Sequence, residues 1–282
     1  MKAHTEPDDG FSRLVCSLNL SGLTGTKIIL WLLAIAIVSY AIGFGIIAIT
    51  GALSPSSGHT ISPFVMGSMA AQNTTTFARD GAVAGTVRIT MGAGELLVRG
   101  GAPFGSIMES GISGTAPEWQ PEYGQSATGG VMTISMTDPG KMGKGWFSLD
   151  PPKIWEVALA EDIPLELAVK LGAGDCTLEL GGLNLTAFSL DAGTGEATVD
   201  LGGYHGGTFS GRIDQGIGDL TVRIPRESNT RVVIDQGVGD IRYSGLVMQG
   251  KEYTTRGFDP AGPAITILID QGVGDIRLEA VP

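Results

Sequence analysis

The chain has 282 residues, of which 44 are glycine and only 6% are aromatic, and it carries a formal net charge of −11. This composition favours strands and turns over helices, and the length allows one large or two small domains. An acidic chain of this kind repels a phosphate backbone, so nucleic-acid binding is disfavoured.

The N-terminal part of the chain predicts a membrane anchor. Residues 1–27 are polar and contain as many basic as acidic side chains, which is typical of a short tail. The next segment, from Ile28 to Thr50, has no charged side chain and is long enough to cross a hydrocarbon core of ~30 Å as a helix. A removable signal peptide is the alternative, but its apolar core is normally shorter.

The charges that flank this segment predict its orientation. Lys27 lies at the start of the span, and the next basic side chain on the far side is Arg79. The positive-inside rule therefore predicts a cytoplasmic tail over residues 1–27 and a single-pass protein of the cell membrane. Everything that follows the span is then expected to be extracytoplasmic.

Residues 51–84 are rich in Ser, Pro, Gly and Thr and are expected to form a linker. Residues 85–282 are dominated by a repeated phrase, Gly-x-Gly followed by an acid. It occurs at Gly92 to Glu95, Gly172 to Asp175, Gly193 to Glu196, Gly216 to Asp219, Gly237 to Asp240 and Gly272 to Asp275. In the middle of the chain the phrases are spaced by 21, 23 and 21 residues, which is a period typical of solenoids.

Strict alternation of apolar and polar residues surrounds most phrases, and period two indicates strands with one buried face. Each coil is therefore expected to be strand, Gly-rich turn, strand, and the fold class an all-β, single-stranded β-solenoid with one N-terminal transmembrane helix. The residues four positions after each second glycine should stack on the inner face, namely Leu178, Val199, Val222, Tyr243 and Leu278.

Within the phrase, the two glycines are expected to supply positive φ angles at a sharp corner. The acids Asp175, Asp219, Asp240 and Asp275 are expected to accept backbone N–H bonds there. The alternative is a ladder of acids bridged by calcium, together with Asp214, Asp235 and Asp270 of the repeated Asp-Gln-Gly. Calcium needs six to eight oxygen ligands, and the known calcium-binding coil carries its acid at a different offset.

Residues 103–154 diverge from the repeat. They contain Trp119, Tyr123, Trp146 and Phe147 and several prolines, and they precede Trp155. An end-cap that covers the first coil with aromatic side chains is the favoured interpretation. A recognition surface carried on loops is the alternative.

The sequence from Trp155 to Asp175 reads WEVALAEDIPLELAVKLGAGD, and LGGLNL follows from Leu180. In this order of strand, Pro-Leu-x-Leu, Gly-Ala-Gly-Asp and Gly-Leu, residues 85–282 resemble the toast-rack family. More distantly, they resemble adhesin-like β-solenoids and the outer domains of membrane proteins tied to envelope-stress sensing. The resemblance implies a β-solenoid without a catalytic residue to transfer. Those stress-sensing relatives have several spans, which weakens a direct signalling role for this chain.

No motif predicts catalysis, a cofactor or a metal site. His4, His59 and His205 are scattered, no His/Cys cluster occurs, and Cys176 lies on the inward phase of a strand, as expected of a small buried hydrophobe. We therefore expect a non-enzymatic structural or interaction module, in adhesion or envelope-stress sensing, with a partner in the cell envelope. A carbohydrate-binding or carbohydrate-processing β-helix is the alternative, because Asp200, Arg223, Arg242 and Arg277 point outward.

Overall fold

The computed structural model describes residues 73–113, 120–140 and 153–282. These residues form strands joined by turns and loops, with no helix among them, so the all-β prediction is confirmed. The predicted tail over residues 1–27, the predicted span over residues 28–50 and most of the predicted linker lie outside the described residues. In the part of the chain that is described, no helix is sufficiently long and apolar to cross a membrane.

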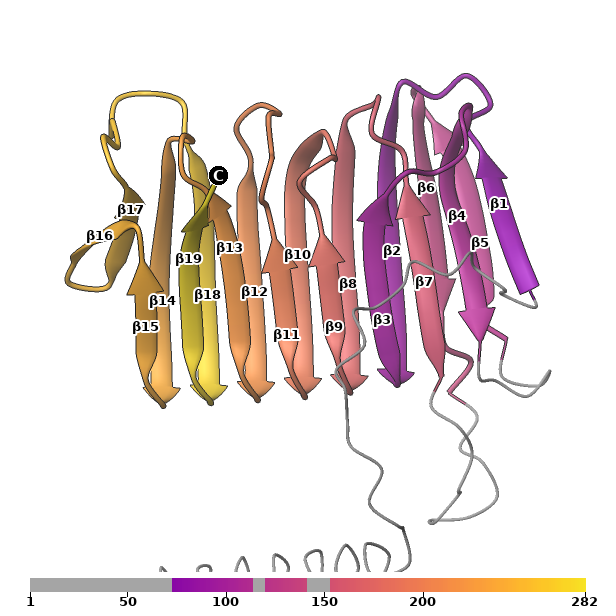
Figure 1. The fold of residues 1–282 in the computed structure, drawn as a ribbon. Helices are drawn as coiled ribbons and strands as arrows, with labels where there is room; N and C mark the ends of the chain where they lie inside the picture. Colours follow the sequence, from indigo (N-terminus) through magenta and orange to yellow (C-terminus); the bar gives the residue numbers. More distant parts are fainter. Residues whose placement is uncertain (1–72, 114–119, 141–152) are drawn as a thin grey trace, which may run out of the picture. The chain divides into compact units, whose positions relative to one another are not determined.

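The strands form two mixed sheets that lie face to face (Figure 1). Sheet A contains, in spatial order, β1 (Asn73–Ala78), β4 (Ser106–Ser113), β7 (Ile154–Leu159), β3 (Glu95–Gly100), β9 (Cys176–Glu179), β11 (Ala197–Asp200), β13 (Leu220–Pro225), β19 (Ile276–Val281) and β15 (Ile241–Ser244). Sheet B contains β16 (Leu246–Gln249), β17 (Glu252–Thr255), β14 (Thr230–Val238), β18 (Ile265–Val273), β12 (Ser210–Ile217), β10 (Leu185–Thr194), β8 (Leu165–Ala173), β2 (Ala84–Ala93), β6 (Val131–Thr137) and β5 (Glu122–Thr128).

One coil consists of a strand of sheet B, a glycine corner and a strand of sheet A, as in β8 followed by β9. In Figure 1 the sheet B strands of these coils run toward the lower edge, and the sheet A strands run back up. Neighbouring coils pair in parallel in both sheets. Because side chains alternate along each strand, one set points between the sheets, and residues such as Val169 and Leu178 are almost completely buried there.

The predicted inner register is confirmed by the strand pairing. Leu178 pairs with Val199, Val199 with Val222, and Leu278 with both Val222 and Tyr243. The first three and Leu278 are fully buried, whereas Tyr243 remains 44% exposed. Its strand β15 forms the edge of sheet A, so no further strand covers it.

The coils are not stacked in chain order throughout, which corrects the expectation of a simple solenoid. The C-terminal coil β18–β19 lies between β12–β13 and β14–β15 and pairs in parallel with both. At the other end, β6 and β7 pair with the outer sides of β2 and β3, while β8 and β9 pair with their inner sides. At the C-terminal end the chain therefore skips one position and later fills it, and at the N-terminal end it forms the outer coil before it continues on the inner side of β2 and β3.

Antiparallel strands complete both ends of the stack. At the N-terminal end β5 pairs with β6, and β4 pairs with β7 and with β1. Trp155 on β7 is fully buried, and the rings of Phe77 and Tyr123 lie 5.2 Å apart. Trp119, Trp146 and Phe147 lie outside the described residues. At the C-terminal end the hairpin β16–β17 pairs with β14.

The two glycines of each phrase are required for different reasons, which corrects the prediction that both supply a positive φ. The second glycine has φ between +117° at Gly174 and +144° at Gly239, a region that side chains disfavour. The first glycine does not have a positive φ. At Gly172 an added Cβ would lie 2.5 Å from the carbonyl oxygen of Gly92, so close coil stacking excludes a side chain.

Candidate functional site

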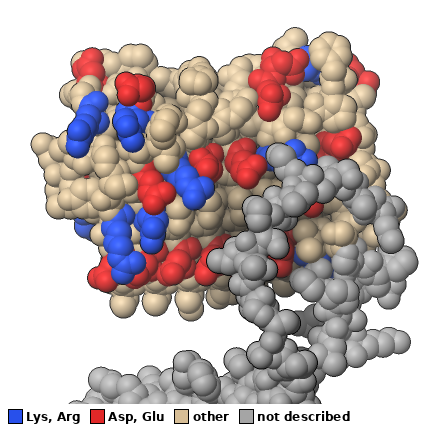
Figure 2. Space-filling model, in the orientation of Figure 1, with Lys and Arg blue, Asp and Glu red and all other residues tan. Residues whose placement is uncertain are grey.

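The glycine corners lie along one edge of the molecule, and their acids form a row from coil to coil. In spatial order the row contains Asp175, Glu196, Asp219, Asp275 and Asp240, as the strand pairing shows. In Figure 2 acidic side chains follow the lower edge of the molecule, where the corners lie. This row is the ladder that the repeat spacing suggested.

Three carboxylates of this row accept a backbone N–H from the adjacent coil. Asp219 Oδ1 accepts the N–H of Asp275 at 2.9 Å, and Asp275 Oδ1 accepts that of Asp240 at 3.0 Å. Asp175 accepts the N–H of Glu196 at 3.1 Å in the same way. Asp175, Asp219 and Asp275 thus accept N–H bonds, as the turn interpretation predicts, but these bonds connect neighbouring coils and do not close the acids' own turns. Asp240, whose strand β15 is at the edge of sheet A, forms an ion pair with Arg242 instead.

A second row of acids lies on the outer face of sheet B. Asp191, Asp214, Asp270 and Asp235 are paired in register, one on each of four neighbouring strands. Arg212 binds Asp214 through two bonds of 2.7 Å, and this hydrogen bonding raises the pKa of Arg212. Lys251 lies 2.7 Å from Asp235. Among the described residues, no three His, Cys, Asp or Glu side chains are placed to hold a metal ion together.

Three glutamines form an internal ladder that the sequence analysis missed, because it considered only the acid of each Asp-Gln-Gly. Gln215, Gln271 and Gln236 are in register on β12, β18 and β14. Each donates its Nε2–H to the carbonyl oxygen of the second glycine in an adjacent coil, at 2.8 Å for Gln215 and 2.6 Å for Gln236. The glycine corners are therefore fixed from the inside by amides and from the outside by carboxylates.

The outer face of sheet A contains the charged residues that were proposed for carbohydrate chemistry. Arg223 Nη1 lies 3.1 Å from Asp200 Oδ2, and its Nε lies 3.5 Å from Glu279 Oε2. The hydrogen bond that Arg223 donates to Asp200 raises the pKa of Arg223. Arg242 and Arg277 are neighbours in register, nearer the corner, and they bind Asp275 and Glu279 respectively. Blue and red side chains accordingly intermingle on this face in Figure 2.

An open polar depression of about 590 Å³ lies on the same face. Its charged lining consists of Arg99, Glu161, Glu179, Asp200 and Arg223. Asp200 and Arg223 are thus brought together, while Arg242 and Arg277 are not part of this depression. The arrangement can hydrogen-bond hydroxyl groups through both its guanidinium and its carboxylate groups.

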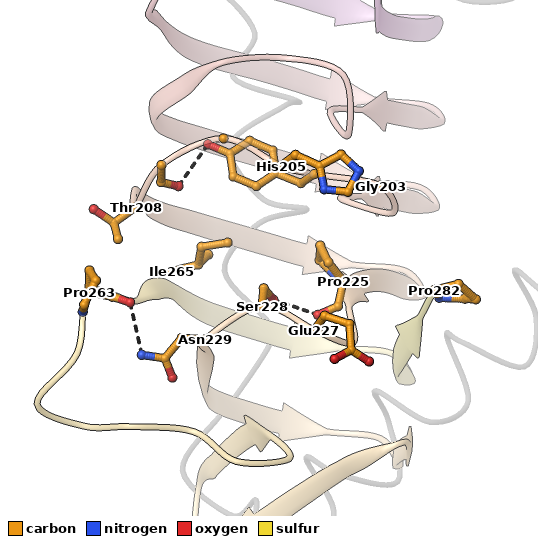
Figure 3. Close-up of a pocket in the computed structure, with 13 residues that line it drawn as sticks. Gly203, His205, Thr208, Pro225, Glu227, Ser228, Asn229, Pro263, Ile265 and Pro282 are labelled. Atoms are coloured by element: carbon orange, nitrogen blue, oxygen red, sulfur yellow. Dashed lines mark hydrogen bonds between the residues drawn. The ribbon is translucent and has the colours of Figure 1, made fainter.

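A second depression, of about 580 Å³, lies at the edge of the molecule opposite the glycine corners. It is lined by the loops that connect one coil to the next (Figure 3). Tyr204 is buried, and its hydroxyl donates toward the carbonyl oxygens of Leu185 and Gly207, both at 3.2 Å. Burial raises the pKa of Tyr204. Figure 3 shows His205 and Glu227 on opposite sides of the depression. No hydrogen bond joins these two side chains, so Glu227 does not orient His205 as a general base.

Cys176 is 2% exposed, and burial raises the pKa of its thiol to about 12. The prediction of a small buried side chain is therefore confirmed, since a thiol of this kind is a poor nucleophile near neutral pH. Of the three histidines, only His205 is described; His4 and His59 lie outside the described residues.

Comparisons with known proteins agree with the fold. The family model for the N-terminal domain of toast_rack (DUF2154) matches residues 66–223. The crystal structure of a protein from Clostridium sporogenes, described as a "putative cell adhesion protein", superposes with a TM-score of 0.69 at 22% sequence identity. The superposition covers 74% of this chain and 98% of that one. No curated protein matches the chain significantly. At this identity the likeness to the Clostridium protein establishes a shared fold.

Proposed function

This chain belongs to the toast-rack family, and on that premise we propose that it is a membrane-anchored, extracytoplasmic interaction module. It acts by binding an envelope or protein partner and not by catalysis. Cell adhesion is the context that the related fold supports, because the Clostridium protein with this fold is described in those terms. Envelope-stress sensing is a second context, which rests on the distant family resemblance.

The observation that carries this proposal is the rigid stack of coils with charged outer faces. Backbone bonds continue through the corners, as between Gly195 N and Ile217 O at 2.9 Å and between Ala197 N and Asp219 O at 3.0 Å. The stack therefore presents rows of side chains at the fixed spacing of neighbouring strands, ~4.8 Å. A fixed array of this kind favours recognition, because a preorganised surface loses little conformational entropy on binding.

Anchoring is supported by the uncharged segment from Ile28 to Thr50 and by Lys27 at its start. Single-pass anchoring with a cytoplasmic N-terminus would place the acidic repeat domain outside the membrane. The net charge of the whole chain disfavours phosphate-rich partners, so nucleic acid is not part of the proposal.

The test is to express the full-length chain in host cells and to add protease to intact cells or spheroplasts. The proposal predicts that the repeat domain fractionates with membranes and is digested from outside, and that surface display of the chain increases cell attachment. Full protection of the domain would contradict the anchored orientation, and digestion without any change in attachment would contradict adhesion.

The polar depression on sheet A supports carbohydrate binding as a second candidate. Its charged lining resembles sites in which carboxylates and guanidinium groups bind sugar hydroxyls. The test is a glycan-array measurement with the wild-type chain and with Arg223→Ala. Binding that this substitution abolishes supports the candidate. An array without signal contradicts it and leaves the adhesion proposal unchanged.

A further inference from the structure

The tip of the glycine corners carries an unusual row of exposed apolar side chains. The middle residue of each Gly-x-Gly points outward, and in three neighbouring coils it is Ile217, Val273 and Val238. Their exposed fractions are 56%, 46% and 66%. We call these three residues the corner ridge. Farther along the same row the residues are small, namely Thr194, Ala173 and Ala93.

Nothing in the fold requires large apolar residues at these tips. A turn residue between two glycines is usually polar, and the coils with Ala173 and Thr194 form the same corner without a large side chain. Because the three residues are adjacent in register, they form one contiguous apolar strip and not scattered exposed residues. A contiguous apolar strip with a polar border is typical of a contact surface.

Acids border the ridge on both sides. On the sheet B side are Asp214, Asp270 and Asp235, and on the sheet A side are Asp219, Asp275 and Asp240. Three basic side chains bridge to this set, namely Arg212, Lys251 and Arg242. The Asp240 and Asp235 side chains remain 79% and 73% exposed. The ridge therefore lies in a field of excess negative charge.

This charge decides which kind of partner fits. A second ridge from another copy of the chain would bring the same acids together, and anionic lipid headgroups or phosphates would be repelled as well. A polypeptide with basic side chains on either side of one or two apolar ones is complementary in both respects. Its apolar groups would cover the ridge, while its lysines or arginines would reach the two acid rows.

We propose that the corner ridge is the docking surface for a cationic, amphipathic polypeptide segment of a partner protein. The inference rests on the proposed interaction function and names the chemistry of its partner. Apolar contact supplies specificity for the ridge, and the acid rows supply attraction that depends on ionic strength.

The test uses the full-length chain in detergent and a fluorescein-labelled decapeptide of alternating lysine and valine as probe. Binding is measured by fluorescence anisotropy at low salt and at about 0.15 M salt, where the screening length is ~8 Å. The triple variant I217S/V238S/V273S should weaken binding at least about tenfold without lowering the melting temperature, because these side chains contact solvent. The matched control is Leu268→Ser, which removes a 41% exposed apolar residue from the outer face of sheet B.

Two further probes separate the contributions. A lysine–serine decapeptide tests positive charge without apolar contact, and a glutamate–valine decapeptide tests apolar contact without positive charge. Each should bind the wild-type chain at least about tenfold more weakly than the lysine–valine decapeptide does. Thr194→Ile, which extends the ridge by the position paired with Ile217, should strengthen binding of the lysine–valine probe.

Equal binding of the lysine–serine probe, or an unchanged affinity of the triple variant, would overturn the proposal. If the wild-type chain binds none of the three probes, the proposal is overturned as well. None of these three results would bear on the anchored orientation, which the protease experiment tests separately.

Discussion

At the scale of single residues, the corner depends on the two glycines of each phrase in different ways. The first glycine permits the approach of a neighbouring carbonyl oxygen, and the second also has a φ that only glycine adopts without strain. Both requirements meet at Gly218, where φ is +136° and an added Cβ would lie 1.8 Å from Gly195 O.

Gly218→Ala is therefore predicted to destabilise the protein by more than about 2 kcal/mol, because it combines backbone strain with a collision against a fixed carbonyl group. The measurement is thermal unfolding of the full-length chain. Gly207→Ala is the control, since Gly207 has no positive φ and its added Cβ would meet nothing within 4 Å. An equal melting temperature for both variants would contradict the proposed tightness of the corner.

Because the thiol of Cys176 is buried, we expect the free energy of unfolding to fall at alkaline pH. The folded pKa of about 12 lies above the ordinary value of 9.0, so folding favours the protonated thiol. The resulting stability is fully present below pH 9 and is lost as the pH rises toward 12. Between pH 8 and about pH 10.5, the wild type should lose about 2 kcal/mol more unfolding free energy than Cys176→Ala. Equal losses in the two proteins would show that the thiol is not shielded as described.

At the scale of elements, strand positions and inward phase follow from the sequence, but the order of the coils does not. Alternation over Leu165 to Leu171 predicts β8, and the shared spacing predicts that Leu178, Val199 and Val222 align. The order depends instead on long-range pairing. The coils that contain Gln215, Gln236 and Gln271 carry the same Asp-Gln-Gly-x-Gly-Asp pattern, so any order of the three would form similar amide and carboxylate ladders.

The corner ridge could have been found from the sequence. Ile217, Val238 and Val273 occupy the outward tip of a turn, where a polar residue is the usual choice. Apolar residues at these three positions could therefore have been noticed in the sequence. That they lie next to one another could not have been predicted without the order of the coils. The N-terminal end was less predictable, because its strands are separated by residues that do not follow the repeat, and β6 and β7 pair outside β2 and β3.

The position of the C-terminal coil β18–β19 between two other coils leads to a prediction for a C-terminally truncated chain. Removing residues 265–282 deletes β18 and β19, which lie between two other coils. The backbone amides of β15 should then lose protection in hydrogen exchange, because β19 is the strand that pairs with it. The amides of β14 that face β18 should lose protection as well, whereas the pairing of β14 with β17 remains. The amides of β10, which pairs with β8 and β12, provide the internal control. Retained protection of β15 would indicate stacking in chain order.

At the scale of the whole molecule, the acid rows do not require a cation for stability. The carboxylates of Asp175, Asp219 and Asp275 accept backbone N–H groups, and Arg242 binds Asp275. Transfer from calcium to EDTA should therefore change the melting temperature of the full-length chain by less than about two degrees. A drop of about ten degrees, which is large for a domain of this size, would identify these acids as metal ligands.

The central claim is that the repeat domain is presented outside a membrane while the N-terminal tail remains inside. The most direct test labels cysteines of the full-length Thr194→Cys variant with a membrane-impermeant maleimide in intact cells. Thr194 is an exposed corner residue, Cys176 is buried, and Cys16 lies in the predicted cytoplasmic tail. The claim predicts labelling of Thr194→Cys in intact cells, labelling of Cys16 only after permeabilisation, and labelling of Cys176 only after unfolding. Labelling of Cys16, but not of Thr194→Cys, in intact cells would contradict it.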